Sequence, residues 1–386
     1  EFKELQIQNP ETYYEVYNEK NERELEQLAE LKWESPTSLK YLERVNHPSV
    51  PTIYPPMAQY VFRAVHFFQP DSILAMRVAF LVFDVLALFF IIRILGKLRL
   101  NRNMSGFYFW CPLMIKETYN STHLDIIGIS FLCGSIYFLV HSRHTLATFF
   151  LALGFLGKLY PAILFPLYIQ ACFERCKKSE GNPWRTPILN SLFFVGVIFL
   201  GYVPFMGIGL QMFDGLKAYS LYWQSNDSIF ACLLFLFKNL PGDLNNITFL
   251  SNSLPVFLSK LTVVCVLMGV LIWLLLKNTS LIKDPQTFLK QFFILMALVF
   301  LLSPIQNPWY LCWVVPFLCL FPNRAWILLT GLVGLYYLDF YFDYQEIQSW
   351  SQWIPWLEYL PFYVLLIWDM RNKNRVLEAG KNNEIP

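Results

Sequence analysis

The chain has 386 residues, of which 55% are hydrophobic and only 15% are charged, whereas soluble domains carry roughly 25% charged residues. This composition excludes an ordinary soluble domain and is typical of a polytopic membrane protein. The formal net charge of +2 argues against nucleic acid as a partner. We expect an all-α fold, in which transmembrane helices form a bundle with interfacial helices on its outer side.

The N-terminal segment, residues 1–72, is predicted to be an outer loop that carries a surface helix. Residues 1–45 hold eleven glutamates against six Lys and Arg residues. The four prolines that follow predict an extended stretch over residues 46–54, which ends where Pro56 suits the first turn of a helix.

That helix is predicted to be amphipathic and three to four turns long. Its polar face carries Arg63 together with Gln59 and His66. Apolar side chains recur at helical spacing on the other face, namely Met57, Tyr60, Val61, Ala64, Val65 and Phe68. The helix is too short to span a bilayer, so we expect it to lie along the membrane surface.

Residues 73–386 are predicted to form the transmembrane domain, interrupted by an outer loop at 209–253. A span needs about 20 apolar residues, or fewer when it is broken or buried among other helices. We predict about eleven spans, near 73–95, 104–118, 124–140, 146–160, 161–173, 187–208, 254–276, 288–303, 308–321, 325–342 and 355–370. The two spans divided at "GKLYP" could equally form one bent or re-entrant element.

Basic residues in the short loops predict the orientation. When the spans alternate, every strongly basic connection falls on one side, which is then cytoplasmic. These connections contain Lys97, Arg99, Arg102, Arg143, Arg175, Lys177, Lys178, Arg185, Lys277, Lys283, Arg324, Arg371, Lys373 and Arg375. Because the first residues then lie outside, we expect at least one further span upstream of Glu1.

Candidate functional residues gather in the predicted outer loops. In "CPLMIKETYNSTHLDIIGISF", the ionisable residues Lys116, Glu117, His123 and Asp125 surround a turn between two apolar runs. Ionisable groups near a membrane are costly and therefore indicate function. The alternative is structural, because Glu117 and Asp125 could cap helix ends or pair with Lys116.

Two other outer segments contain candidates for binding. Lys158 in "GKLYPAILFPL" would suit a phosphate at headgroup level, or it could reach to the interface as a structural lysine. In "SPIQNPWYLCWVVPF", Gln306 and Asn307 supply hydrogen-bonding groups beside Trp309 and Tyr310. Such a set suits a sugar ring, although the two aromatic residues could simply be interface anchors.

Other features of the sequence point to structure and not to chemistry. Asp84, in mid-span with Arg77 seven residues before it, is expected to pair with a neighbouring helix. The eight cysteines match neither a disulfide framework nor a metal site and are interpreted as small apolar residues. There is no Walker loop, Rossmann glycine pattern or HExxH motif, so we expect no nucleotide site, no metal and no cofactor.

Four motifs, in this order and spacing, resemble integral-membrane glycosyltransferases of the type C fold, particularly bacterial mannosyltransferase-like members. They are "NHPSVPTIYPPMAQYVF", "WCPLMIKETYNSTHLDIIGI", "GKLYPAILFPL" and "SPIQNPWYLCWVVPF". The resemblance implies transfer of a hexose, with inversion, from a polyprenyl-phosphate donor to a lipid or glycan acceptor. It also implies a location in a bacterial plasma membrane, with the active site on the extracytoplasmic side.

The resemblance also implies roles for individual residues. The family's usual acidic base lies soon after the first span, so we expect it upstream of Glu1. Glu117, His123 and Asp125 are the candidates for catalysis within this sequence. Lys158, Arg63 and Lys116 are the candidates for the donor phosphate. The candidates for substrate binding are Asn46, His47, Tyr54, Gln306, Asn307, Trp309 and Tyr310.

Two other functions fit the composition. The first is a transporter or flippase for a lipid-linked or small polar substrate, although no inverted repeat is visible and mid-span charge is sparse. The second is a non-catalytic scaffold subunit of an envelope-assembly complex.

Overall fold

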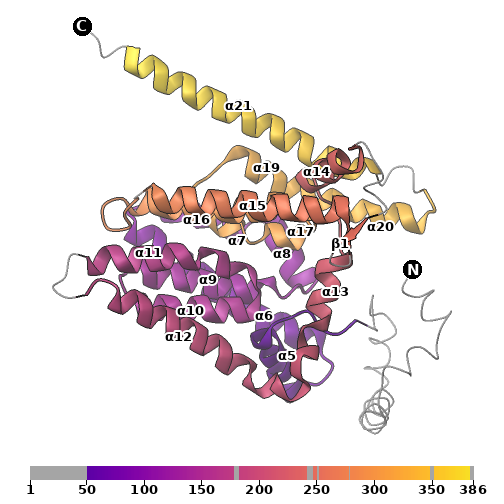
Figure 1. Cartoon of the computed structure of the whole chain (residues 1–386), viewed down its shortest axis with the longest axis horizontal. Helices are drawn as coiled ribbons and strands as arrows, with labels where there is room; N and C mark the ends of the chain where they lie inside the picture. Colours follow the sequence, from indigo (N-terminus) through magenta and orange to yellow (C-terminus); the bar gives the residue numbers. More distant parts are fainter. Residues whose placement is uncertain are drawn as a thin grey trace.

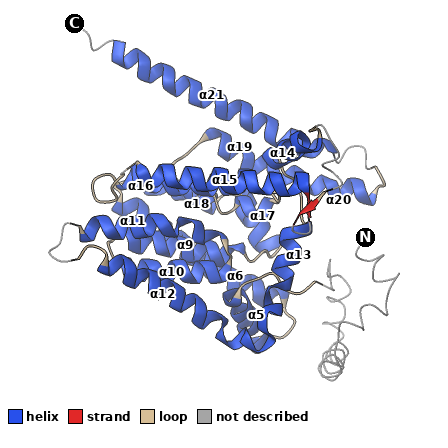
Figure 2. Ribbon diagram, viewed as in Figure 1, coloured by secondary structure: helices blue, strands red, loops and turns tan. Residues whose placement is uncertain are grey.

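A computed structural model of the chain describes residues 50–177, 182–240, 247–249, 252–277, 279–347 and 352–382, with side chains up to residue 372. Helices make up nearly all of the regular structure of these residues (Figure 2). The one small sheet described pairs β1 (Thr248–Phe249) antiparallel with β2 (Asn252–Ser253). The predicted all-α fold is confirmed.

The amphipathic helix is the first element described. Pro55 is extended, and Pro56 opens α5 (Pro56–Phe68), as predicted. Ala58 is fully buried, whereas Phe67 and Phe68 at the other end are 79% and 81% exposed. Thirteen residues rise only about 20 Å, so α5 cannot cross a bilayer on its own.

Within the described residues, five helical stretches are long and apolar enough to span a membrane. They are α6 (Ile73–Lys97), the run of α12 (Arg185–Tyr202), η4 (Val203–Phe213) and α13 (Asp214–Tyr222), α15 (Leu254–Leu276), α16 (Pro285–Leu302), and the run of α19 (Arg324–Leu332), η6 (Val333–Tyr336) and α20 (Tyr337–Tyr344). Large apolar side chains on α6, α12 and α15 are exposed, as contact with lipid requires. The chain is therefore a multi-pass membrane protein.

The shorter apolar helices α9 (Asp125–Val140) and α10 (His144–Gly157) pack inside the bundle. Helix α11 (Phe165–Cys176) is half-buried, whereas α14 (Ile229–Lys238) buries only Phe230 and Leu234 and exposes half of its residues. Most residues of α9 are buried, because α6 and α10 pack against it (Figure 1). Helices of this length can remain in the core because neighbouring helices cover them.

Three predicted spans are broken. Residues 104–118 and the turns around them form η1 (Arg102–Ser105), α7 (Gly106–Phe109), α8 (Pro112–Ile115) and the π-helical turn η2 (Lys116–Asn120). Residues 308–321 form α17 (Pro308–Leu311) and α18 (Val315–Leu318), and residues 161–173 divide between η3 (Tyr160–Leu164) and α11. Pro112, Pro161 and Pro316 each lie in the first turn of a helical piece, because proline fits a first turn and interrupts a continuing one. The count of eleven spans is not confirmed.

The segment predicted as an outer loop, 209–253, is partly helical. It contains most of the kinked run η4–α13, with Gly209 at φ 60°, followed by α14 and the small sheet. Helix α21 (Ile354–Asn382) begins against α19 and then diverges from the bundle (Figure 1).

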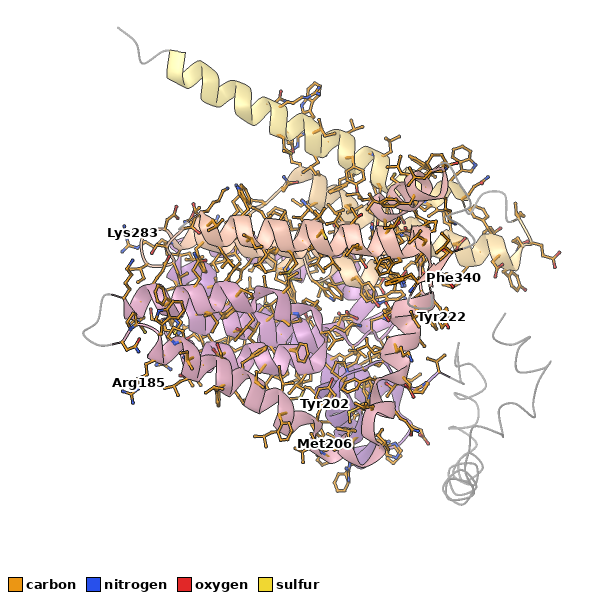
Figure 3. All side chains as sticks on the ribbon, in the orientation of Figure 1. Arg185, Tyr202, Met206, Tyr222, Lys283 and Phe340 are labelled. Carbon is orange, nitrogen blue, oxygen red and sulfur yellow. The ribbon has the colours of Figure 1, made fainter. Side chains whose placement is uncertain are left out.

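The bundle has two chemically different ends. Arg185 and Lys283 lie together at one end, and Tyr222 and Phe340 lie at the other (Figure 3). Arg185 and Lys283, which belong to two of the predicted basic connections, therefore lie away from α13 and α20.

Candidate active site

Lys158 and Asp125 form a buried ion pair. Lys158 is extended between the last residue of α10 and η3, and Asp125 is the first residue of α9. The Lys158 Nζ lies 3.4 Å from Asp125 Oδ2, and the indole Nε1 of Trp313 donates to Asp125 Oδ1 at 2.6 Å. The side chains of Lys158 and Asp125 are only 12% and 4% exposed, so their charges depend on each other for compensation.

Aromatic rings surround the ammonium group of Lys158. The ring centroids of Tyr54 and Tyr310 lie 5.0 Å and 5.1 Å from Nζ. Tyr160 stacks on Trp313 with centroids 4.0 Å apart. All of these residues line a cavity of about 360 Å³, which we call the Lys158 cavity. Aromatic faces attract a cation while they leave most of the cavity wall apolar.

Glu117 forms a second polar cluster in the π-helical turn η2. The Tyr337 hydroxyl donates to both carboxylate oxygens, at 2.8 Å and 2.9 Å. Lys116 Nζ and His123 Nε2 lie 3.6 Å and 3.5 Å from the carboxylate. Lys116 also lies over the Tyr337 ring, 3.2 Å from its centroid. This buried carboxylate is therefore fully surrounded by donors and cations.

His123 joins the two clusters. Its ring stacks on Trp309 with centroids 4.0 Å apart and an interplanar angle of 14°. Burial, together with the positive charges of Lys158 and Lys116, lowers the pKa of His123 to about 3. The imidazole is therefore neutral at pH 7. Trp309 also contacts Tyr310 of the Lys158 cavity, with centroids 5.7 Å apart.

The structure thus brings together most of the candidates, which come from four separate motifs. These are Tyr54, Lys116, Glu117, His123, Asp125, Lys158, Trp309 and Tyr310. They converge because three helix breaks, after α10, within η2 and before α17, place polar residues at the same end of the bundle.

Other candidates lie elsewhere. Gln306 is fully buried and its amide is used within the protein: it donates to Leu301 O and Ser303 O and accepts from Ser228 Oγ. Asn307 is also buried, at the start of α17. Arg63 is exposed on α5 and is not among the described residues that line the Lys158 cavity. Asn46 and His47 lie outside the described residues.

The sequence interpretation did not select four residues of the site, Trp313, Tyr160, Tyr219 and Tyr337. Trp313 follows Trp309 and Tyr310 at helical spacing, and this spacing could have indicated a shared face. Tyr219, whose hydroxyl forms a hydrogen bond with that of Tyr310, comes from the predicted outer loop. No local sequence pattern could have indicated Tyr337, because its partner Glu117 lies 220 positions away in the chain.

Asp84 has the structural role that was predicted. Its two carboxylate oxygens accept hydrogen bonds from the hydroxyls of Tyr108 and Tyr119, each at 2.5 Å. It therefore ties α6 to α7 and to η2. Arg77 does not pair with it and instead donates to the turn at residues 120–122.

The site lies at the end of the bundle away from the basic connections. Tyr219 belongs to α13, and Tyr222 at the end of that helix lies opposite Arg185 and Lys283 (Figure 3). Fold and site together define a multi-pass membrane protein with a polar, aromatic site at one end of its helices.

The chain belongs to glycosyltransferase family 87, whose sequence model matches residues 52–304. The match includes Tyr54, Glu117, Asp125 and Lys158, and the resemblance to membrane glycosyltransferases of the type C fold is confirmed. No curated protein and no solved structure matches the chain. The protein is therefore a membrane glycosyltransferase.

Proposed function

We propose that this glycosyltransferase moves a hexose, with mannose as the first candidate, from a polyprenyl-phosphate donor to a lipid or glycan acceptor, with inversion. The observation that carries the proposal is Lys158, a buried cation in the wall of an otherwise largely apolar cavity. A polyprenyl-phosphate sugar needs both features, a cation for its phosphate and an apolar surface for its chain. A soluble nucleotide sugar would need a more polar site.

The chemistry follows from these positions. The acceptor hydroxyl oxygen attacks the anomeric carbon from the face opposite the phosphate, and a new C–O bond forms. The bond between the anomeric carbon and the phosphate oxygen breaks, and its electron pair leaves with polyprenyl phosphate. Lys158 stabilises that departing anion, and a carboxylate accepts the proton of the acceptor hydroxyl.

The hexose would lie near Trp309 and Tyr310. Trp309 is already stacked on neutral His123, and Tyr310 extends the aromatic surface toward Lys158. The CH faces of a sugar pack on such rings, while the nearby imidazole and tyrosine hydroxyls supply hydrogen bonds.

The two buried carboxylates differ in their surroundings. Asp125 forms the ion pair with Lys158 and accepts a hydrogen bond from Trp313, so we assign it to holding Lys158 in place. Glu117 lies next to His123, at the sugar-binding surface, and is the better candidate base among the described carboxylates.

We propose that the reaction takes place on the extracytoplasmic side of a bacterial plasma membrane. Arg185 and Lys283, from two of the basic connections that favour the cytoplasmic side, lie at the end of the bundle opposite Tyr222, which ends the helix that carries Tyr219 of the site (Figure 3). Residues 1–72 would then be an extracytoplasmic loop and residues 73–386 the transmembrane domain.

Substitution of Lys158 tests the proposal. In the full-length protein in lipid nanodiscs, Lys158→Ala should weaken binding of polyprenyl phosphate at least tenfold, since a hydrogen bond to a charged group contributes about 1.5–3 kcal/mol. Because this change leaves Asp125 without its cation, the double variant Lys158→Ala, Asp125→Asn serves as a second test. The matched control is Lys277→Ala, which removes another lysine that lies over an aromatic ring, 3.6 Å from the centroid of Trp273.

Unchanged donor affinity in both Lys158 variants would exclude Lys158 from the phosphate site. Transfer of labelled hexose is measured in the same preparation. Counterflow of substrate without covalent change would instead support the transporter hypothesis.

A further inference from the structure

A groove separate from the Lys158 cavity lies between α5, the start of α6 and the turn at residues 120–122. It has a volume of about 470 Å³ and shares no lining residue with the Lys158 cavity. Its lining includes Phe62, Val65, Met76, Arg77, Ser121 and Thr122. We call it the Arg77 groove.

Arg77 gives the groove a cation. Its guanidinium donates to Asn120 O at 3.2 Å and to Thr122 Oγ1 at 3.4 Å. Within the described part of the chain these contacts use two of its five N–H groups. Arg77 and Asn120 also line an adjoining hollow of about 640 Å³ that contains Lys116. Two cations therefore flank one short turn.

The surroundings of the groove are suited to lipid. Phe67, Phe68 and Leu74, from the end of α5 and the start of α6, are 70–81% exposed, and Trp110 near the adjoining hollow is 72% exposed. The carboxylate of Asp71, which also lines the groove, lies 3.9 Å from His66. A half-buried arginine next to exposed apolar side chains matches a lipid that carries an anionic headgroup.

The groove adjoins the proposed reaction centre. Asn120, Ser121 and Thr122 line the groove, and His123 and Asp125, directly after them, contact Trp309 and Lys158. Lys116 contacts both Ser121, at 2.7 Å, and Glu117, at 3.6 Å. A headgroup bound at Arg77 would therefore lie only one turn of chain away from Glu117 and His123.

We propose that the Arg77 groove binds the acceptor, and that this acceptor is a lipid with a phosphate group that contacts Arg77. The assignment as acceptor depends on the proposed transfer reaction, whereas binding of the phosphate-bearing lipid does not. The donor phosphate and the acceptor phosphate would occupy different sites, at Lys158 and at Arg77.

Lipid binding by the full-length protein in detergent micelles tests the site. The probes are dioleoylphosphatidylglycerol, which carries a phosphate, dioleoylglycerol, which does not, and undecaprenyl phosphate. Arg77→Gln should weaken phosphatidylglycerol binding at least tenfold and leave undecaprenyl phosphate binding unchanged, whereas Lys158→Ala should do the reverse. Arg77→Lys, which keeps the charge but loses the planar fork, should retain part of the affinity.

A matched control removes an arginine at the other end of the bundle. Arg143→Gln changes an exposed residue beyond the end of α9, whose 16 residues extend about 24 Å from Asp125, and it should affect neither lipid. Equal loss of both lipids in Arg77→Gln would mean that Arg77 only supports the fold, and it would overturn the proposal, as would unchanged phosphatidylglycerol binding.

The charge of the labelled product tests whether the acceptor is a phosphate-bearing lipid. Radiolabelled polyprenyl-phosphate mannose and lipids extracted from the host membrane should give a labelled product that, once separated from the donor, which is itself anionic, by thin-layer chromatography, is retained by an anion exchanger. Arg77→Gln should lower kcat/KM for the extracted acceptor at least tenfold without changing the KM of the donor. A labelled product that passes unretained would be neutral and would overturn the assignment, even if phosphatidylglycerol binds as bulk lipid. Absence of any transfer would count against the proposed function, while the binding result would still decide the groove.

A labelling experiment on the unsubstituted protein covers the case in which Arg77→Gln does not fold. A photoactivatable phosphatidylglycerol should attach to peptides within residues 62–77 and 120–122. Attachment confined to other segments would contradict the proposal.

Discussion

At the scale of single residues, the buried carboxylates of the site already have cationic or hydrogen-bonding partners within the protein. Asp125 has Lys158 and Trp313, and Glu117 has Tyr337, Lys116 and His123. Buried charges require such partners, because their desolvation costs several kcal/mol per ion. Positions fixed in this way are preorganised for a transition state in which charge moves from acceptor to phosphate.

The lowered pKa of His123 predicts that the stability of the protein depends on pH. Its pKa in the folded protein, about 3, is below the ordinary value of 6.5, so between these values the unfolded chain binds more protons than the folded one. Protonation of His123 in the unfolded chain therefore lowers the free energy of unfolding as the pH falls below 6.5, whereas above pH 6.5 this loss is absent. The loss at pH 5 should be on the order of 1 kcal/mol.

His123→Phe should keep the ring stacked on Trp309 and remove this dependence. Thermal unfolding at pH 7.5 and pH 5 checks it. The fall in Tm between the two pH values should be smaller in the variant than in the unsubstituted protein. An equal fall in both would show that other groups cause the acid sensitivity.

At the scale of elements, the functional side chains lie where helices are interrupted. Lys158 is extended after α10, Glu117 lies in the π-helical turn η2, and Trp309 is in the short helix α17. Interrupted helices at membrane depth are tolerated only where protein or a cavity surrounds them. The breaks therefore let polar residues reach the site from helices that are otherwise apolar.

Close packing of α9 and α10 positions one of these breaks. A Cβ atom at Gly128 would lie 3.1 Å from the Cβ of Lys158, and one at Gly157 would lie 3.1 Å from Ile127. Small residues allow two membrane helices to approach this closely. The short distance between α9 and α10 therefore fixes the position of Lys158, which directly follows α10.

Gly128→Ala should therefore displace Lys158 and weaken donor binding about tenfold, because a shift of roughly 1 Å is costly at a catalytic site. It should also lower stability by about 1–3 kcal/mol, as overpacking does. Gly196→Ala in α12 is the control, since a Cβ there meets no atom within 4 Å. Donor titrations and thermal unfolding measure both effects, and normal affinity in Gly128→Ala would show that Lys158 tolerates the shift.

At the scale of the whole molecule, the bundle separates a basic end from the end that carries the site (Figure 3). Contacts between distant parts of the chain build that second end, such as Trp313 with Asp125 and Tyr337 with Glu117. The positive-inside rule predicts that the basic end faces the cytoplasm.

Cysteine labelling on intact cells tests the orientation. With the exposed cysteines Cys232 and Cys265 replaced by alanine, Glu346→Cys after α20 should react with a membrane-impermeant maleimide. Lys283→Cys at the basic end should react only after the cells are opened. The opposite pattern would place the site in the cytoplasm.

Several features followed from the sequence alone, because they depend on local composition and spacing. Apolar run length predicted α15 at residues 254–276 and α6 to within two residues. The proline pattern predicted the start of α5, and the Gly and Pro beside Lys158 indicated the break there. The same motifs carried the resemblance to membrane glycosyltransferases, which the family match confirmed.

Only the tertiary structure decided which side chains meet. Trp313 reaches Asp125 across 188 positions and Tyr337 reaches Glu117 across 220, and no local pattern encodes such a contact. Packing also decided that the Gln306 amide donates to backbone carbonyl groups and that Arg77 lines a groove beside the site. The physical reason is that helix formation depends on neighbours in sequence, whereas the fate of a buried polar group depends on which donors and acceptors the packed helices bring within hydrogen-bonding distance.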